Sequence, residues 1–455
     1  MGKYQAYPEY KDSGIEWIGD IPKHWELWKL THAYEEIGSG TTPPSTDAEW
    51  YGGTVPWVTT GELREKEIYS TTKNVTDDAL RSFTALRKYP KGSIAIAMYG
   101  ATIGRLGIFG VEATTNQACC VFTKSSVVDN HYLYYWLQAF RQDIVNLASG
   151  GGQPNINQEV VASLKVSCPD KVGQEIIVSF LDHETAKIDT LIDKQQQLIQ
   201  LLKEKRQAVI SHAVTKGLNP NAPMRDSGVE WLGEVPEHWV IKSYRYAAKI
   251  YRGKFNHRPR NDPAFYDGKY PFIQTGDVAQ ADKKITEYKQ TLNERGIGVS
   301  QKFPSGTLVM AIAANIGDTA ILDFEAYAPD SVVGFKPYDG IDLEFLRYSL
   351  KAALPALEQT STQSTQANLN IDRIGAVKAS FPPVAEQEEI VRFLDALHER
   401  YAIIEIKAKE AIELMQERRT ALISAAVTGK IDVRHPVCHP TGDLQSSKST
   451  VHGDL

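Results

Sequence analysis

The chain has 455 residues, of which 42% are hydrophobic and 23% charged, a composition typical of a soluble globular protein with two to four domains. Its net charge of −6 argues against a partner bound by bulk electrostatic attraction alone, so nucleic acid would have to be held by local basic clusters. Four cysteines without paired spacing exclude a disulfide-stapled secreted protein and favour reduced thiols in the cytoplasm. The opening residues lack the apolar core of a secretory signal, and no run approaches the roughly 20 apolar residues of a membrane helix.

A stretch near the start of the chain is repeated in its second half. DSGIEWIGDIPKHW at 12–25 returns as DSGVEWLGEVPEHW at 226–239, with nine of fourteen positions identical. Further pairs follow in the same order and at a nearly constant spacing: VPWVTTGEL with YPFIQTGDV, GSIAIAMYGATIG with GTLVMAIAANIG, and QEIIVSFLD with QEEIVRFLD. A repeat of about half the chain is far longer than a solenoid repeat. It predicts two copies of one unit related by a pseudo-twofold axis, and two tandem domains without a fixed geometry are the alternative.

Each copy begins with a globular part, residues 1–170 in the first and 219–383 in the second. The short apolar runs SIAIAM and TLVMAIA predict buried strands. The stretches HYLYYWLQAF and LEFLRYSLKAAL have the spacing of amphipathic helices. We therefore expect two domains of the α+β (α/β-like) class.

Each copy ends in a long helix, predicted at 171–218 and 384–433. A proline precedes each helix, and Gly217 or Gly429 follows near its end as a stop signal. About 40 residues make a helix of roughly 60 Å, and apolar residues at alternating steps of three and four give it one apolar stripe. The pseudo-twofold axis makes the two helices an antiparallel coiled coil, whereas packing of each helix on its own domain is the alternative. The predicted seam consists of Leu181, Ile188, Leu191, Leu198, Leu202, Val209, Leu394, Leu397, Tyr401, Ile404, Met415 and Leu422.

The tail at 434–455 is polar and expected to be disordered. Its His and Cys residues lack the spacing of zinc ligands, so no metal site is predicted there.

Catalytic motifs are missing from the sequence. It has no phosphate-binding Walker loop, no Gly-x-Ser-x-Gly elbow and no His-Glu-x-x-His. A DNA amino-methyltransferase should carry a Pro-Pro-aromatic tetrapeptide, but TTPPS and FPPV both lack the aromatic residue. Pro329-Asp330 lacks the lysine-bearing half of a metal-nuclease motif. We therefore predict a non-catalytic chain.

Polar loops differ between the copies while the surrounding frame agrees. GSGTTPPSTD at 38–47 is replaced by the basic YRGKFNHRPRND at 251–262, and Arg and Asn carry the forked donors that match guanine and adenine edges. Loops are commonly polar because they are solvated, but one frame with divergent loops is typical of two reading heads for two sequences. The candidate DNA-contacting residues are Thr41, Thr42, Thr59, Thr60, Tyr99, Arg105, Gln153 and Asn155 in the first copy, and Arg252, Lys254, Asn256, His257, Arg258, Arg260, Gln274, Thr275, Asn315, Gln363, Gln366 and Asn368 in the second.

Taken together, these stretches resemble the specificity (S) subunit of type I restriction–modification systems. SGIEWIGDIPKHWE, VPWVTTGEL, YGATIG, GGGQPNIN and the helix that begins QEIIVSFLD carry the resemblance, which covers both copies to about residue 433. It implies two target-recognition domains, each reading one half of a split double-stranded DNA site, and an antiparallel coiled coil that fixes the spacer between the halves.

The resemblance also implies partner proteins. Two methyltransferase (M) subunits would dock on the long helices, and motor–nuclease (R) subunits would complete the restriction enzyme. S-adenosylmethionine, ATP and Mg would then be bound by those partners, with no cofactor on this chain. The alternatives are a scaffold protein whose globular ends bind protein or carbohydrate, and a self-sufficient methyltransferase.

Overall fold

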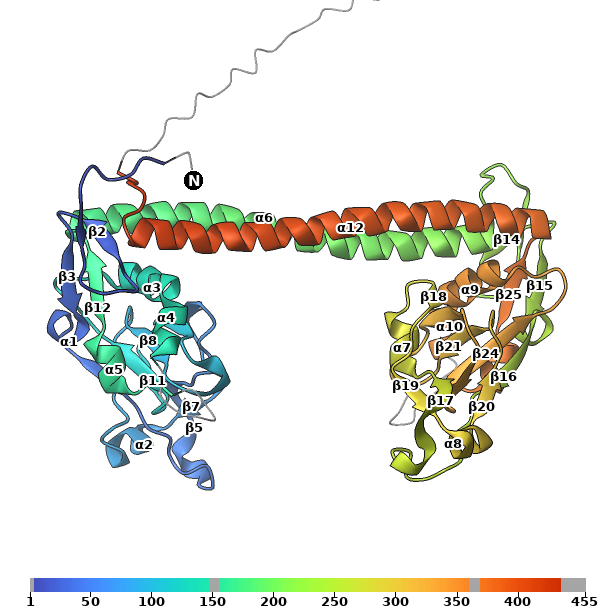
Figure 1. Cartoon of the computed structure of the whole chain (residues 1–455), viewed down its shortest axis with the longest axis horizontal. Helices are drawn as coiled ribbons and strands as arrows, with labels where there is room; N and C mark the ends of the chain where they lie inside the picture. The colour runs from blue at the N-terminus through green and yellow to red at the C-terminus, as the bar shows by residue number, and fades with distance from the viewer. Residues whose placement is uncertain (1–3, 148–154, 360–368, 435–455) are drawn as a thin grey trace, which may run out of the picture. The chain divides into compact units, whose positions relative to one another are not determined.

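The structure is a computed structural model that describes residues 4–147, 155–359 and 369–434 (Figure 1). Among these residues no helix is long and apolar enough to cross a membrane.

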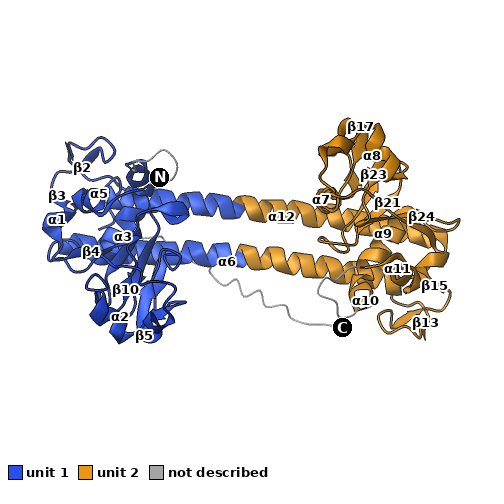
Figure 2. Cartoon of the chain, turned by 90° about the horizontal axis from the view of Figure 1, so that it is seen from below, with its two compact units in different colours: residues 1–194, 411–455 blue, residues 195–410 orange. Residues whose placement is uncertain are grey.

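The chain forms two compact units (Figure 2). Unit 1 comprises residues 1–194 and 411–455, and unit 2 comprises residues 195–410. The boundaries fall inside two long helices, α6 (Lys171–Lys216) and α12 (Val384–Val427). Each unit therefore consists of one globular domain together with a part of both helices.

Each globular domain is built on a five-stranded sheet with the same strand order in both units. The order is β4-β11-β8-β9-β6 in unit 1 and β16-β24-β21-β22-β18 in unit 2. Neighbouring strands are antiparallel except at one edge, where β6 is parallel to β9 and β18 to β22. The register also agrees, because Cys119 lies opposite Ala97 and Val332 opposite Ala311. The strands are β4 (Ile37–Ser39), β6 (Lys66–Ile68), β8 (Ile94–Ala97), β9 (Leu106–Phe109) and β11 (Cys119–Phe122), and β16 (Ala248–Arg252), β18 (Lys284–Ile285), β21 (Leu308–Ala311), β22 (Thr319–Leu322) and β24 (Val332–Pro337).

A second, smaller sheet carries the strand after each variable loop. Its order is β10-β5-β7 in unit 1 and β19-β17-β23-β20 in unit 2, and four two-stranded pairs complete the domains: β1-β2, β12-β3, β13-β14 and β15-β25. The strands are β1 (Tyr10–Asp12), β2 (Asp20–Pro22), β3 (Glu26–Lys29), β5 (Tyr51–Val58), β7 (Asn74–Val75), β10 (Thr114–Thr115), β12 (Lys165–Cys168), β13 (Met224–Asp226), β14 (Glu234–Pro236), β15 (Val240–Ser243), β17 (Tyr266–Phe272), β19 (Gln290–Leu292), β20 (Gln301–Phe303), β23 (Ala326–Ala328) and β25 (Lys378–Phe381).

Short helices cover the sheets. The predicted amphipathic segments form α3 (Asn130–Ala139) and α9 (Leu343–Ala352), and each has an aspartate N-cap, Asp129 or Asp342. The predicted α+β class is thus confirmed in both domains. The other helices are α1 (Leu30–Ala33), α2 (Asp77–Ser82), α4 (Arg141–Asn146), α5 (Gln158–Ser163), α7 (Thr275–Gln280), α8 (Glu294–Val299), α10 (Leu354–Gln359) and α11 (Ile371–Ala376), with 3-10 turns at Ala48–Trp50, Gly100–Thr102, Tyr244–Tyr246 and Pro263–Phe265.

The repeated opening stretch builds the same corner in both domains. The Asp12 carboxylate accepts the N–H of Gly14 at 2.8 Å, and Gly14 sits at φ +68°, a left-handed conformation that favours glycine. The equivalent bond joins the matching pair in unit 2. The tryptophan that ends each stretch, Trp25 or Trp239, is fully buried in its core. The stretch recurs because each core needs this turn and this ring.

The two long helices pack against each other within each unit. In unit 1 the first half of α6 meets the last part of α12, where Ile188 and Ile192 share a core with Leu422. In unit 2 the last part of α6 meets the first part of α12, where Ile210 shares a core with Leu394. The beginning of each helix therefore packs on the end of the other, which makes the pair antiparallel as predicted.

One of the two predicted apolar rows differs from the structure by a single residue. Leu191 and Leu198 are exposed, at 49% and 37%, while Ile192 is buried and Ile199 half-buried. The α6 row that contains Leu181, Ile188, Leu202 and Val209 does face the partner helix, but its neighbour runs through Thr185, Ile192, Ile199, Arg206 and Ala213. On α12 the predicted Leu394, Tyr401, Met415 and Leu422 lie in the buried or half-buried row, and Leu397 and Ile404 are half-buried at its side.

Candidate nucleic-acid interface

The variable loops leave the scaffold at equivalent points in the two units. The first loop begins at Gly40, directly after β4, and the second at Gly253, directly after β16. A Cβ on Gly40 would lie 1.7 Å from the carbonyl oxygen of Thr115, and one on Gly253 would lie 2.0 Å from that of Pro329. Only glycine lets the loop cross this neighbouring backbone, so the starting direction of both loops is fixed.

A tyrosine at the far end of each loop supplies a second common anchor. Tyr51, the first residue of β5, donates its hydroxyl to the carbonyl of Pro43 at 2.6 Å. Tyr266, the first residue of β17, donates to the carbonyl of Arg260. Both anchors act on the backbone, so they hold loops of different sequence equally well.

In unit 2 the loop and the last residue of β16 carry an arginine cluster gathered around one carboxylate. Arg260 donates through Nη2 to both oxygens of Asp330, at 2.7 and 2.8 Å. Nη2 of Arg258 lies 3.8 Å from the same carboxylate, and Arg252 donates through Nε to the main-chain oxygen of Asp330 at 2.6 Å. About half of the Arg258 and Arg260 side-chain surfaces stays exposed, at 56% and 49%. The structure thus brings together three of the predicted arginines.

The middle of the same loop is rigidly held. The His257 ring stacks on Phe265 with centroids 4.0 Å apart, and its Nε2 lies 2.9 Å from Oδ2 of Asp262. The N–H of Ala264, and after it the bond to His257, holds the pKa of the Asp262 carboxyl below its usual value. The side chains of Lys254 and Asn256 are exposed. The loop therefore presents its polar side chains from a fixed backbone.

In unit 1 the loop is almost free of charge. Thr42 donates its hydroxyl to Oε1 of Gln117 at 2.6 Å, and the main-chain oxygen of Thr41 accepts the indole N–H of Trp57 at 3.2 Å. Thr42 is exposed and Thr41 half-buried. The same scaffold position thus carries loops of different chemistry in the two units.

The remaining predicted residues fall into small groups near the loops. Tyr99 and Asn155 form an antiparallel backbone bridge, which brings two separate predicted loops together. The side-chain amide of Asn315 lies 3.4 Å from the carbonyl of Thr275. Thr59 and Thr60 follow β5 and Arg105 precedes β9, and all three are half-buried. Gln153, Gln363, Gln366 and Asn368 lie outside the described residues.

A groove of about 340 Å³ joins the arginine loop to the next predicted group. Arg260 and Gln274 both line it, and the Gln274 amide donates to Oε1 of Gln290. Tyr266 and the buried Phe272 are its aromatic lining residues. Guanidinium, amide and aromatic groups are the side chains that contact base edges and faces.

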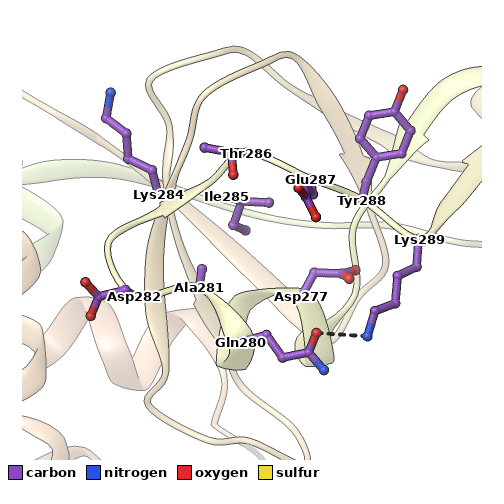
Figure 3. Close-up of a pocket in the computed structure, with 10 residues that line it drawn as sticks. All are labelled: Asp277, Gln280, Ala281, Asp282, Lys284, Ile285, Thr286, Glu287, Tyr288 and Lys289. Atoms are coloured by element: carbon purple, nitrogen blue, oxygen red, sulfur yellow. Dashed lines mark hydrogen bonds between the residues drawn. The ribbon is translucent and has the colours of Figure 1, made fainter. Parts of the chain in front are cut away.

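A second groove of unit 2, of about 380 Å³, lies between α7 and the segment from β18 to β19 (Figure 3). Its lining mixes both charges, with Asp277, Asp282 and Lys284 around the buried Ile285. Lys289 reaches the Gln280 side chain at its rim, at 2.8 Å. Such a polar lining differs from the largely apolar clefts that hold small molecules.

The structure adds two residues that the sequence-based prediction omitted, Gln117 and Asp330. Each precedes a strand of the five-stranded sheet, β11 or β24, by two positions, and each bonds to the variable loop of its own unit. The two residues occupy equivalent positions of the repeat, so alignment of the two copies could have paired them. The two contacts themselves could not be read from the sequence, because they join segments 75 and 70 residues apart.

The potential metal ligands and nucleophiles of the described residues are dispersed or buried. Nowhere in residues 4–147, 155–359 and 369–434 do three His, Cys, Asp or Glu side chains gather closely enough to hold a metal ion. Cys119, Cys120 and Cys168 are buried, and burial raises the pKa of the Cys120 thiol to about 12. This thiol therefore stays protonated at neutral pH.

Comparison with known proteins places this geometry in context. The family model described as "Type I restriction modification DNA specificity domain" matches residues 22–201 and 255–414. The chain is 23% identical to the MjaIX specificity subunit of Methanocaldococcus jannaschii, over 95% of this chain and 99% of that one. It is 21% identical to the EcoKI specificity subunit of Escherichia coli, over 74% and 73% of the two chains.

Two solved structures share the fold. A chain from a structure of a type I R-M system superposes with a TM-score of 0.70 at 14% identity, covering 90% of this chain and 98% of that one. The HsdS subunit from Thermoanaerobacter tengcongensis gives a TM-score of 0.51 at 14% identity, with the same coverage.

Proposed function

The chain belongs to the family of type I restriction–modification DNA specificity domains, and we therefore propose that each of its units reads one half of a split DNA site through its variable loop. Two recognition domains on one chain make it a DNA sequence-specificity subunit. One observation carries the assignment of the loops: the same sheet, glycine crossing and tyrosine anchor hold a threonine-rich loop in unit 1 and an arginine-rich loop in unit 2.

The chemistry of the two loops supports different targets. The side chains of Arg258 and Arg260 are about half exposed, and guanidinium groups suit guanine edges in the major groove. The unit 1 loop offers threonine hydroxyls, which bond to several bases and whose methyl groups contact thymine. The DNA site is therefore expected to be asymmetric.

The long helices offer a docking surface for two methyltransferase (M) subunits. In unit 2 the side chains of Leu201, Ile403 and Ile406 are exposed at 61%, 54% and 54%, away from the helix seam. Ile403 and Ile406 are three positions apart and so share one face of α12, and exposed apolar side chains on a helix face are typical of protein interfaces. Restriction (R) subunits would join that complex and turn a methyltransferase into an endonuclease.

We expect the partner subunits, and not this chain, to bind the cofactors. S-adenosylmethionine, ATP and Mg are proposed to bind the M and R subunits, while this chain acts as a non-catalytic subunit. The complex would work in the cytoplasm, where the DNA is accessible.

Sequencing of methylated adenines tests this function. Cells that carry this chain and its M subunits should methylate one two-part motif, and deletion of this chain alone should abolish it. Arg258→Ala with Arg260→Ala should relax only one half of the motif, at a cost of roughly 1–3 kcal/mol per base-reading pair. The double variant Lys249→Ala with Lys378→Ala removes two exposed lysines of the same unit and should keep the motif. Methylation that persists without this chain, or equal loss in both halves, would contradict the proposal.

A further inference from the structure

The two variable loops share their backbone anchors but differ in one side-chain anchor. The shared anchors are the glycine crossing at Gly40 and Gly253 and the hydroxyl bond from Tyr51 or Tyr266. These contacts are indifferent to loop sequence because they engage the backbone. The third anchor is a side-chain bond, and its chemistry changes between the units.

The register of the central sheet shows that this third anchor occupies one position. Cys119 pairs with Ala97 in unit 1 and Val332 with Ala311 in unit 2. The residue two places before each of these, Gln117 or Asp330, reaches across to the loop. Gln117 accepts the Thr42 hydroxyl at 2.6 Å, and Asp330 accepts Arg260 at 2.7 and 2.8 Å.

We propose that Gln117 and Asp330 are positioning residues that set which bases their loops accept, a role that rests on the proposed function. Both oxygens of Asp330 accept from Nη2 of Arg260, so this charge-assisted contact holds one corner of the guanidinium at a fixed point beside the loop. About half of that side chain remains exposed, so its other N–H groups can still face a base. Gln117 holds the neutral hydroxyl of Thr42 in place in the same way, and the hydroxyl oxygen stays free to accept a hydrogen bond.

Asp330 has a second effect that Gln117 lacks. Its negative charge competes with DNA phosphates for Arg258 and Arg260, which lie 3.8 and 2.7 Å away. Indiscriminate binding through phosphates is thereby weakened, while a base contact that keeps the guanidinium in place is not. Loss of the carboxylate should therefore raise affinity for any DNA and lower discrimination.

The test uses the full chain in complex with its M subunits and the motif found for the wild type. Methylation rates are compared on duplexes with one base substituted in either half of the motif, and binding to an unrelated duplex is measured against salt. Asp330→Asn should reduce discrimination about tenfold at the half read by unit 2 and leave the other half unchanged. Its log–log salt slope should steepen by about 0.9 for each additional phosphate that the protein neutralises.

Gln117→Leu is the matched test in the other unit, where no charge is involved. It should relax the half read by unit 1 by a similar factor and leave the salt slope unchanged. Asp323→Asn is the control, because it removes the same charge from an exposed ion pair with Lys284 at 3.0 Å. It should leave both halves and the salt slope as in the wild type.

The outcomes separate this inference from the function on which it rests. If the wild-type complex reads a two-part motif but both variants leave discrimination intact, or weaken both halves alike, the positioning role is refuted and the function stands. If the wild-type complex has no two-part motif, both fail.

Discussion

Lys351, near the end of α9, is a half-buried charged residue of unit 2. Burial, and after it the neighbouring Arg347, lowers the pKa of its ammonium from 10.5 to about 8. Asp282 and Asp318 act in the opposite direction, and Arg206 of α6 adds to the repulsion. Gln138, near the end of α3, occupies the equivalent place in unit 1. Unit 2 thus holds a cation where unit 1 holds a neutral side chain.

We expect Lys351→Met to stabilise the chain at neutral pH. Between pH 8 and 10.5 the unfolded state binds more protons at this site, so the free energy of unfolding of the wild type rises with pH. Below pH 8 the charged Lys351 destabilises the folded state by its full amount. The variant should raise the free energy of unfolding by up to about 3 kcal/mol at pH 7, and the gain should vanish near pH 10.5. Urea unfolding at pH 7 and at pH 10.5 measures the gain and its loss, with Lys249→Met, at an exposed lysine, as the control. A gain that is independent of pH would show that packing, and not charge, is responsible.

One buried glutamine joins each long helix to its globular domain. Gln174 of α6 is fully buried, and its side chain accepts the N–H of Asp129 and donates to the carbonyls of Val127 and Pro169. Gln387 of α12 makes the same three bonds in unit 2. The glutamine in the repeated QE dipeptide therefore fixes the start of the helix against the N-terminus of α3 or α9.

Gln174→Ala should destabilise unit 1 by about 1–3 kcal/mol, because it leaves the N–H of Asp129 and two carbonyls without their partner in a dry core. Gln142→Ala removes an exposed glutamine of the same unit and should change stability little. Denaturant unfolding followed by tryptophan fluorescence compares the two. Equal stability of both variants would mean that water replaces the lost bonds.

The long helices show what sequence patterning can and cannot predict. Apolar spacing with proline and glycine at the ends predicted both helices and one complete row of the seam. The second row was displaced by one residue because Leu191 and Ile192, and likewise Leu198 and Ile199, are adjacent apolar pairs. Either member satisfies the spacing, and only the partner helix decides which one is covered. For the same reason the loop composition predicted the arginines but not Asp330, their partner from a distant segment.

Unit 1 is assembled from both ends of the chain. The N–H of Asp432 donates to the carbonyl of Gln5 at 2.7 Å, and Tyr10 donates to the carbonyl of Gly429 at 2.9 Å. Leu422 of α12 packs on the α6 row that contains Ile188. A fragment that ends after α6 therefore retains the first domain but loses the helix that covers this row.

The fragment of residues 1–220 should form an antiparallel dimer. Because of the duplication, Val209 and Ile210 of a second fragment can take the places of Leu422 and Ile423, which are their equivalents in the repeat. A closed dimer presents the same loop twice, so with the M subunit it should methylate an interrupted palindrome built from the half-site of unit 1. Sedimentation measures the dimer and methylome sequencing the motif. A stable monomer, or a dimer that methylates an asymmetric site, would refute this pairing.

Because unit 1 is assembled from distant segments, it can be completed only after the whole of unit 2 has been synthesised. The roughly 220 residues between the two parts of unit 1 take on the order of 10 to 40 s to translate at about 5–20 residues per second. Throughout that time the nascent first domain exposes the apolar row of α6, a surface that chaperones recognise. A chain released before α12 is made keeps the row exposed until a second copy covers it, as in the fragment dimer.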